Sequence, residues 1–255
     1  MIAGATYEQM LATRKHMVLP NGASVWKSYY IRSPQAQEGL SAPQAFLVEQ
    51  GANEVVLPHF HEQNQFQVVV RGGGSVGRSA VAPITVHYAG AYTGYGPISS
   101  GDDGLWYLTL RPMMDNGPLY VHESRDKMKP GPKKHYQSAA LESMPDGDLA
   151  KLARPQTQAI NADPEGPTVE VLRVPPQQRL TAAGPVRGGG QFFFVTGGSL
   201  LANGVEYPKW SCLWVSSSDS AFEVVAGTSG VEVLLLEFPQ TEYRATYSPE
   251  SQIGL

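Results

Sequence analysis

The fold is decided by the stretch PHFHEQNQFQVVVRGGG, residues 58–74. It places His59 and His61 two residues apart on a predicted β-strand, with Gln65 four residues further along and a glycine turn at residues 72–74. Residues i and i+2 of a strand point to the same face of a sheet, so the two imidazoles can converge on one point. This spacing is typical of metal ligands carried by a sheet.

The composition of the chain favours an all-β protein. Of its 255 residues, 42% are hydrophobic and only 16% are charged, and there are 27 Gly and 20 Pro. So few charges and so many turn-forming residues indicate many short strands and not a helical bundle. Cys212 is the single cysteine, which excludes a disulfide framework or a thiolate metal cluster and is interpreted as a small buried hydrophobe.

Charge and hydropathy limit the partners that we expect. The net charge of −4 gives no reason to expect a nucleic acid or an anionic membrane as partner. The sequence contains neither a signal-peptide apolar region nor an apolar run long enough to span a bilayer. We therefore expect a soluble, cytoplasmic protein whose partner is a small molecule.

Two landmarks of the sequence recur in the same order. QFQVVVRGGGSVG (65–77) is similar to QFFFVTGGSLLANG (191–204), and GDDGLWYLTLRP (101–112) is similar to GTSGVEVLLLEFP (227–239), each 126 residues further along. A repeat of this kind predicts a duplicated β domain. Between the copies, residues 113–167 are rich in Pro, Gly and charge and predict a connecting segment with one short helix. Near the N-terminus, residues 5–16 are interpreted as either a short helix or an arm.

At these residues the chain resembles the cupin superfamily. The first cupin motif consists of Gly, His-x-His, three or four residues, Glu, six residues and Gly. Gly51, His59, His61, Gln65 and Gly72 follow this frame, with a longer spacing after the first glycine and Gln65 in place of Glu. The second motif normally supplies a histidine as fourth ligand. The corresponding stretch here, AYTGYGPI (91–98), contains no histidine, and Tyr95 is aligned with the missing ligand.

The resemblance implies a bicupin, in which two antiparallel jelly-roll barrels arise from an internal duplication. Residues 1–112 would form an N-terminal barrel with an N-terminal arm, residues 113–167 the connection, and residues 168–255 a degenerate C-terminal barrel with a tail. No histidine follows His135, so the second barrel cannot form a standard cupin metal site. A homodimer is expected by resemblance.

The candidate metal ligands are His59, His61, Gln65 and Tyr95, for Fe, Mn, Ni or Zn. Replacing Glu with Gln removes one negative charge and weakens the retention of a dication, and Tyr95 would have to ionise or bind as a phenol. Of the other histidines, His87 is interpreted as an exposed or core residue, and His122 and His135 as surface residues.

Two functions remain open at this stage. The first is a metal-dependent enzyme acting on a small organic molecule, with oxygenase-type chemistry ahead of isomerase or lyase chemistry. The second is a non-catalytic bicupin that binds or senses a small molecule and carries a relic metal site. Because cupins host many reactions, the resemblance does not choose between them.

Overall fold

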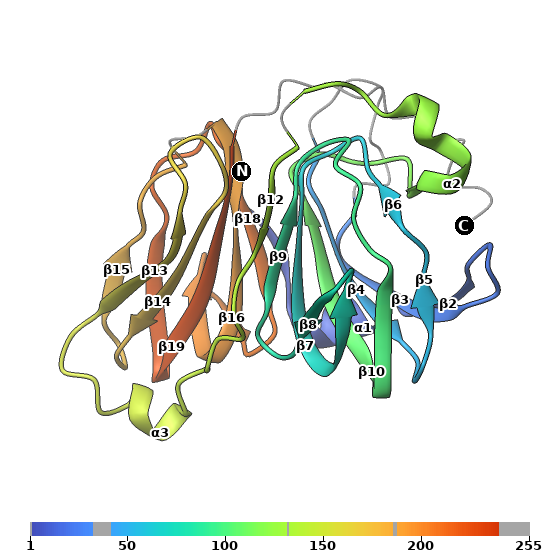
Figure 1. The fold of residues 1–255 in the computed structure, drawn as a ribbon. Coiled ribbons are helices and arrows are strands. Elements are labelled where there is room, and N and C mark those ends of the chain that lie inside the picture. Colours follow the sequence, from blue (N-terminus) through green and yellow to red (C-terminus); the bar gives the residue numbers. More distant parts are fainter. Residues whose placement is uncertain (1, 33–41, 132, 186–187, 240–255) are drawn as a thin grey trace. The chain divides into compact units, whose positions relative to one another are not determined.

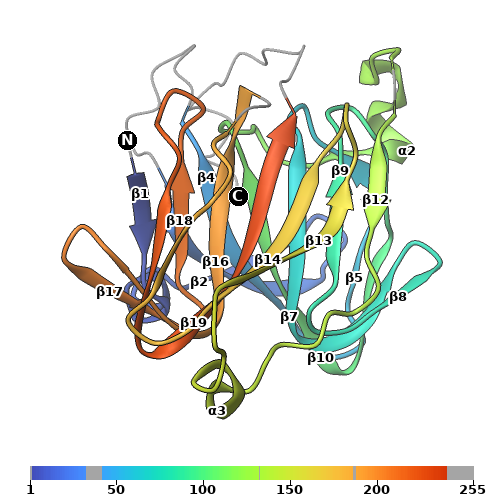
Figure 2. The ribbon, with the colours of Figure 1, turned by 90° about the vertical axis from the view of Figure 1, so that its left-hand side faces the viewer.

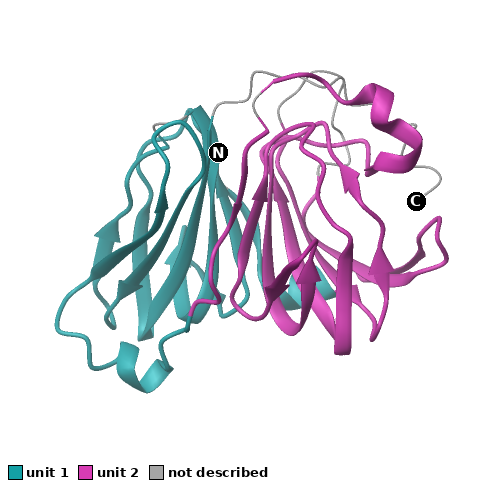
Figure 3. Cartoon of the chain, viewed as in Figure 1, with its two compact units in different colours: residues 1–11, 142–240 teal, residues 12–141, 241–255 magenta. Residues whose placement is uncertain are grey.

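The structure is a computed structural model that describes residues 2–32, 42–131, 133–185 and 188–239. Strands dominate these residues, and the paired strands are antiparallel. Two compact units, coloured separately in Figure 3, comprise residues 1–11 with 142–240 (unit 1) and residues 12–141 with 241–255 (unit 2). The prediction of two antiparallel jelly-roll barrels is confirmed. None of the described helices is long and apolar enough to cross a bilayer.

Unit 2 contains the histidine pair and is built on a nine-stranded sheet (Figure 1). The strand order is β12-β9-β7-β10-β4-β3-β2, with β5 added to β10 and β8 added to β7, while β6 pairs with β11. The strands are β2 Lys15–Val18, β3 Ser24–Ile31, β4 Gln44–Gln50, β5 Val55–Val56, β6 His59–Phe60, β7 Gln65–Val76, β8 Ser79–Val81, β9 Val86–Ala89, β10 Ile98–Arg111, β11 Leu119–Tyr120 and β12 His135–Gln137. The helices are α2 Val121–Ser124 and the 3₁₀ turn η1 Arg125–Lys127.

Unit 1 is an eight-stranded sheet in the order β1-β18-β16-β19-β14-β13, with β15 added to β19 and β17 to β16 (Figure 2). Its strands are β1 Ile2–Ala5, β13 Gln156–Ala162, β14 Thr168–Val174, β15 Arg179–Thr181, β16 Gly188–Ala202, β17 Val205–Pro208, β18 Cys212–Val215 and β19 Glu223–Pro239. Its helices are α1 Tyr7–Leu11 and α3 Asp146–Leu149. Cys212 is fully buried on β18, and burial raises the pKa of its thiol, as expected of a core residue.

The duplication predicted from the sequence extends to the hydrogen-bond register. In unit 2, Tyr107 of β10 pairs with Val69 of β7, and in unit 1 the residues 126 positions later, Val233 and Val195, pair in the same way. Both long strand pairs bend at matching glycines, Gly72 and Gly198, which adopt φ of +74° and +62°. At each of them a Cβ would overlap a carbonyl oxygen of the neighbouring strand, so only glycine fits.

The N-terminal residues belong to unit 1, although the sequence suggested an arm on the first barrel. Strand β1 pairs with β18, and Gly4 approaches it so closely that a Cβ would meet the Cys212 carbonyl oxygen at 2.8 Å. Helix α1 follows, and its start is stabilised reciprocally: Thr6 N donates to Gln9 Oε1 at 2.9 Å and Gln9 N donates to Thr6 Oγ1 at 3.2 Å. Residues 5–16 therefore contain a short helix over Tyr7–Leu11.

The segment 113–167, expected to be a connection, is divided between the units. Its first part contributes β11, α2, η1 and β12 to unit 2, and its second part contributes α3 and β13 to unit 1. The expected boundaries at residues 112 and 168 thus differ from the division in the structure, which falls between Leu141 and Glu142. Of the expected C-terminal tail, residues 240–255 lie outside the described residues.

Candidate functional site

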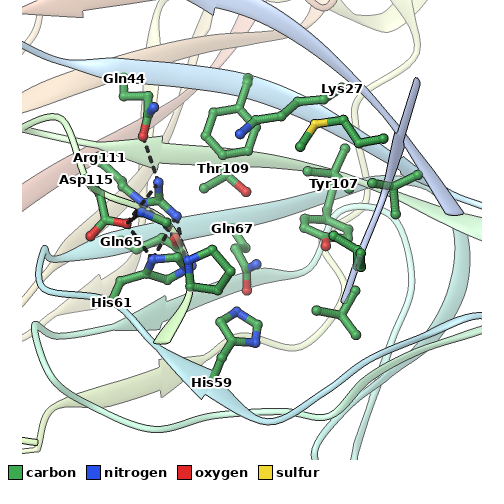
Figure 4. A pocket seen from close by; sticks show the side chains of 18 of the residues that line it. Lys27, Gln44, His59, His61, Gln65, Gln67, Tyr107, Thr109, Arg111 and Asp115 are labelled. Atoms are coloured by element: carbon green, nitrogen blue, oxygen red, sulfur yellow. Dashed lines mark hydrogen bonds and ion pairs between the residues drawn. The ribbon is translucent and has the colours of Figure 1, made fainter. Parts of the chain in front are cut away.

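A cavity of about 470 Å³ lies inside the unit 2 barrel (Figure 4). Its walls follow the two-residue period of the strands, because alternate side chains of a strand share one face. The inward positions are Val25, Lys27 and Tyr29 of β3, Gln44, Phe46 and Val48 of β4, Gln65 and Gln67 of β7, and Tyr107, Thr109 and Arg111 of β10. Such a volume suits a small organic molecule.

His59 and Tyr95 are placed side by side by the backbone. They form an isolated β-bridge, with His59 N donating to Tyr95 O at 3.1 Å and Tyr95 N donating to His59 O at 3.0 Å. The His59 Nδ1 lies 2.7 Å from the Leu57 carbonyl oxygen, so Nδ1 carries the proton. The other nitrogen, Nε2, therefore accepts a hydrogen bond from the Tyr95 hydroxyl at 2.8 Å.

His61 is held by Asp115, a residue from the segment that the sequence suggested to be a linker. The His61 Nδ1 lies 2.7 Å from Asp115 Oδ1. The carboxylate also accepts hydrogen bonds from two backbone N–H groups, those of Glu62 at 3.1 Å and Gly117 at 2.9 Å. Asp115 thus ties the start of the connection to the His-x-His stretch and fixes the orientation of the His61 ring.

Arg111 lies at the centre of the site. Its Nε donates to Gln65 Oε1 at 2.9 Å and its Nη1 donates to Gln44 Oε1 at 2.7 Å. Its Nη2 is 3.0 Å from His61 Nε2 and 3.2 Å from Nδ1, a near-equal pair of distances that places it over the ring face. The hydrogen bond from Arg111 Nε orients the Gln65 amide, whose Nε2 donates to the Tyr95 hydroxyl at 2.6 Å. One hydrogen-bond network thus joins all four predicted ligands through a guanidinium group.

Burial sets the protonation of these groups. It lowers the pKa of His59 to about 3, with the neighbouring His61 adding to the effect. Burial and then Arg111 also lower the pKa of His61, so both rings are neutral at neutral pH. Burial raises the pKa of Tyr95 well above its usual range, which keeps the phenol protonated. For Asp115 burial acts in the upward direction, but the hydrogen bond from His61 and attraction to Arg111 outweigh it and hold the pKa below its ordinary value.

The arrangement does not fit a divalent metal on His59, His61, Gln65 and Tyr95. The Gln65 oxygen that would coordinate the ion accepts from Arg111 instead, and the His59 Nε2 that would coordinate it accepts from the Tyr95 hydroxyl. Within the described residues, no three His, Cys, Asp or Glu side chains gather as metal ligands do. A guanidinium also repels a dication, since each pair of unit charges interacts by roughly 4 kcal/mol at 4 Å and an effective dielectric constant of about 20.

The sequence analysis did not identify the basic and acidic residues of this cavity, among them Arg111, Lys27 and Asp115. Arg111 continues the inward alternation of Tyr107 and Thr109, and that period was the signal by which it could have been found. Lys27 lies likewise between Val25 and Tyr29 on β3. For Asp115 the local sequence carries no such signal, because it follows Pro112 in an irregular segment.

A second histidine pair lies beside the cavity wall. The buried His87 contacts Gln67 Oε1 through Nδ1 at 3.0 Å and His135 Nε2 through its own Nε2 at 2.8 Å. Strand pairing between β9 and β12 places His87 and His135 near each other, with His135 on the exposed side. His87, interpreted as either an exposed or a core histidine, is buried, and the interpretation of His135 and His122 as surface residues agrees with their exposure; His122 contacts Glu123.

Apolar side chains fill the interior of the unit 1 barrel over the residues that the structure describes. The positions equivalent to Gln67, Tyr107 and Thr109 are Phe193, Val233 and Leu235, which belong to its hydrophobic core. The position equivalent to Arg111 is Glu237. Filling the interior with Phe, Val and Leu stabilises the barrel but removes the polar surface that a ligand needs.

No protein-family model matches the chain, and no curated protein matches its sequence. Solved structures do share the fold. A proposed dioxygenase from Nostoc punctiforme has a TM-score of 0.58 at 10% identity, covering 98% of this chain and 84% of that one. The Escherichia coli pirin in complex with nickel(II) has a TM-score of 0.55 at 14% identity, covering 94% and 100%. Oxalate decarboxylase from Lactobacillus farciminis, in a formate complex, has a TM-score of 0.57 at 8% identity, covering 92% and 86%.

At these identities the likeness shows the fold. The chain is a cupin-fold protein of the bicupin type, with two jelly-roll barrels in one chain. The predicted fold class is thereby confirmed, whereas the chemistry of the site must be argued from its own residues.

The buried histidines predict a loss of stability in acid. The pKa values of His59 and His87 are lowered to about 3, so below pH 6.5 the unfolded chain binds protons that the folded chain does not. Stability therefore falls as the pH drops below 6.5, by about 2 kcal/mol per histidine by about pH 5. Urea unfolding at several pH values measures this, and His87→Gln reduces the slope. The matched variant of an exposed histidine, His122→Gln, should keep the wild-type dependence of the unfolding free energy on pH. The same dependence in the wild type and both variants would contradict the role given to His87.

Proposed function

We propose that the unit 2 cavity binds a small carboxylic acid with an apolar body, and that it does so without a metal. The observation that carries this is the charge of the wall: four basic side chains line the cavity and Asp115 is the one carboxylate among the lining residues. The basic residues are Lys15, Lys27, Arg32 and Arg111. Because Asp115 is engaged by His61 and Arg111, the remaining positive charge attracts an anion.

Arg111 supplies the geometry for a carboxylate. A guanidinium has five N–H donors in a planar fork. Two of them have side-chain oxygen acceptors, in Gln65 and Gln44, while Nη2 lies over the His61 ring and Nη1 is also 3.6 Å from Asp115 Oδ1. Donors are therefore left for a ligand, and a planar fork suits a carboxylate. Val25, Phe46 and Val48 form apolar wall for the rest of the molecule.

Phenyllactate is a suitable probe, since it joins a carboxylate to an apolar ring. We expect it to bind the protein with micromolar to sub-millimolar affinity in the presence of EDTA, as measured by isothermal titration calorimetry. Phenylpropanol, the uncharged control, is expected to bind at least about tenfold more weakly, because it lacks the charge that the cationic wall attracts. Equal affinities for the two probes, or binding that requires an added metal, would overturn the proposal.

The alternative is a metal-dependent enzyme, with oxygenase-type chemistry as its leading form. It is supported by the closeness of the His59 and His61 rings, whose centroids are 5.2 Å apart, and by the nickel(II) of the E. coli pirin, which shares the fold. Metal analysis of protein purified without a nickel column separates the two functions. Stoichiometric Fe, Mn, Ni or Zn that is lost in the His59→Ala/His61→Ala variant would support the enzyme; no bound metal and no uptake on titration would support the carboxylate site.

A further inference from the structure

Carboxylate binding alone does not explain the position of Lys27 in the cavity. It lies in the middle of β3 with its side chain directed into the cavity (Figure 4). Its Nζ lies 3.7 Å from the centroid of the Phe46 ring and 5.1 Å from that of Tyr29. Among the described residues no carboxylate lies within ion-pair distance of it, whereas Arg14 and Arg111 have Glu49 and Asp115.

The surroundings of Lys27 favour a neutral amine. Burial against the aromatic rings, followed by repulsion from Arg111 and Arg32, lowers its pKa from 10.5 to about 7. In a large share of the protein molecules the Lys27 amine is therefore unprotonated at neutral pH. An unprotonated lysine is a nucleophile that can attack a carbonyl carbon. The Arg111 guanidinium can hold a carboxylate while Lys27 reacts.

The two groups are close enough to act on one small molecule. Arg111 Cζ lies 5.5 Å from the centroid of the same Phe46 ring that Lys27 Nζ contacts, so both nitrogen-bearing groups lie next to one aromatic side chain. A short ligand with a carboxylate next to a carbonyl group can thus present the carboxylate to Arg111 and the carbonyl to Lys27.

We propose that the ligand of the cavity is an α-keto acid and that Lys27 captures its carbonyl carbon as an imine. The inference rests on the proposed carboxylate site and names the class of its ligand. The Nζ lone pair attacks the carbonyl carbon, a C=N bond replaces the C=O bond, and the oxygen leaves as water with the two amine hydrogens. No oxidant or reductant takes part, and hydrolysis reverses the step.

Reductive trapping tests the imine. The full-length protein is incubated with phenylpyruvate and cyanoborohydride, and the product is analysed by intact mass and peptide mapping. We expect a single adduct on Lys27, with a yield that rises between about pH 6 and pH 8 as the amine loses its proton. Phenylacetone, which has the carbonyl but no carboxylate, is expected to give at least about tenfold less adduct because Arg111 cannot hold it.

Matched variants locate the reaction. Lys27→Arg keeps a long basic side chain but lacks a nucleophilic amine, so the adduct is lost; Lys151→Arg, at an exposed lysine paired with Asp148 in unit 1, keeps the adduct. Circular dichroism checks that both variants are folded. An adduct spread over surface lysines, or retained in Lys27→Arg, would overturn the imine.

Phenyllactate separates this inference from the proposed function, because it has the same ring and carboxylate but no carbonyl group. If phenyllactate binds and phenylpyruvate gives no adduct on Lys27, the imine is wrong and the carboxylate site stands. If phenyllactate does not bind, the carboxylate site is wrong, and the imine inference that rests on it is withdrawn as well.

Discussion

Replacing Arg111 with methionine is expected to destabilise the protein by about 3–5 kcal/mol and to abolish phenyllactate binding. Asp115 is fully buried beside it, and removing the guanidinium leaves that carboxylate with a neutral histidine and two backbone N–H groups. The side-chain oxygens of Gln65 and Gln44 lose a donor in the same change. Urea unfolding measures the stability and calorimetry measures the binding.

Two further variants make this result specific. Arg111→Met/Asp115→Asn removes both charges and should recover part of the lost stability, although an amide at position 115 has only one oxygen to accept from both His61 and the Glu62 N–H. Arg71→Met is the matched control, because Arg71 is exposed and its Cζ lies 4.7 Å from the centroid of the Trp106 ring on the outside of the barrel. This variant should change the free energy of unfolding by about 1 kcal/mol or less. Equal losses in Arg111→Met and Arg71→Met would show that Arg111 does not hold the site together.

The fold could be predicted because its signals are local and occur twice. Short stretches of sequence contain both signals. Each copy has a strand that begins with Gln-Phe, at Gln65 and Gln191, and a bend at a glycine, Gly72 and Gly198. Each glycine is required by the backbone of its own strand pair, so the pattern survives in both copies. The place of β1 could not be predicted, because its pairing with β18 joins residues that are far apart in the sequence.

The site could be predicted only in part, for a related reason. His59 and His61 share a face of one short stretch, so their closeness follows from the strand period. Their partners come from elsewhere: Arg111 is 50 residues and Asp115 is 54 residues from His61. A local pattern identifies which side chains face inward, but it does not say which of them form hydrogen bonds with one another. The hydrogen bond from Arg111 to Gln65 is such a contact, and it makes the histidine pair a poor metal site.

The contacts of Arg111 with Gln65 and His61 also show how the charge of the site is balanced. In a metal site, a carboxylate behind a ligating histidine offsets part of the charge of the ion. Here Asp115 contacts His61 Nδ1 at 2.7 Å in that way, and the cation next to the ring is Arg111. The guanidinium thus takes the electrostatic place of a metal, and Gln65, being neutral, does not add a second negative charge.

Replacing Gln65 and Arg111 together is therefore expected to create a metal site. In Gln65→Glu/Arg111→Met, the repelling cation is gone and a carboxylate joins His59 and His61, so we expect Ni²⁺ and Co²⁺ to bind at least about 100-fold more tightly than to the wild type. Metal at about 100 times its dissociation constant should then stabilise the variant by about 2.7 kcal/mol, visible as a rise in its unfolding temperature.

The single variant Gln65→Glu decides whether the guanidinium is the obstacle. Its carboxylate would lie where Gln65 Oε1 now accepts from Arg111 Nε at 2.9 Å, so it forms an ion pair with Arg111 and gains little affinity for metal. If Gln65→Glu alone binds Ni²⁺ as tightly as the double variant, the missing carboxylate and not Arg111 excludes the metal. If wild-type protein already binds Ni²⁺ that tightly, Arg111 moves aside when metal is present, and the metal-dependent alternative regains its support.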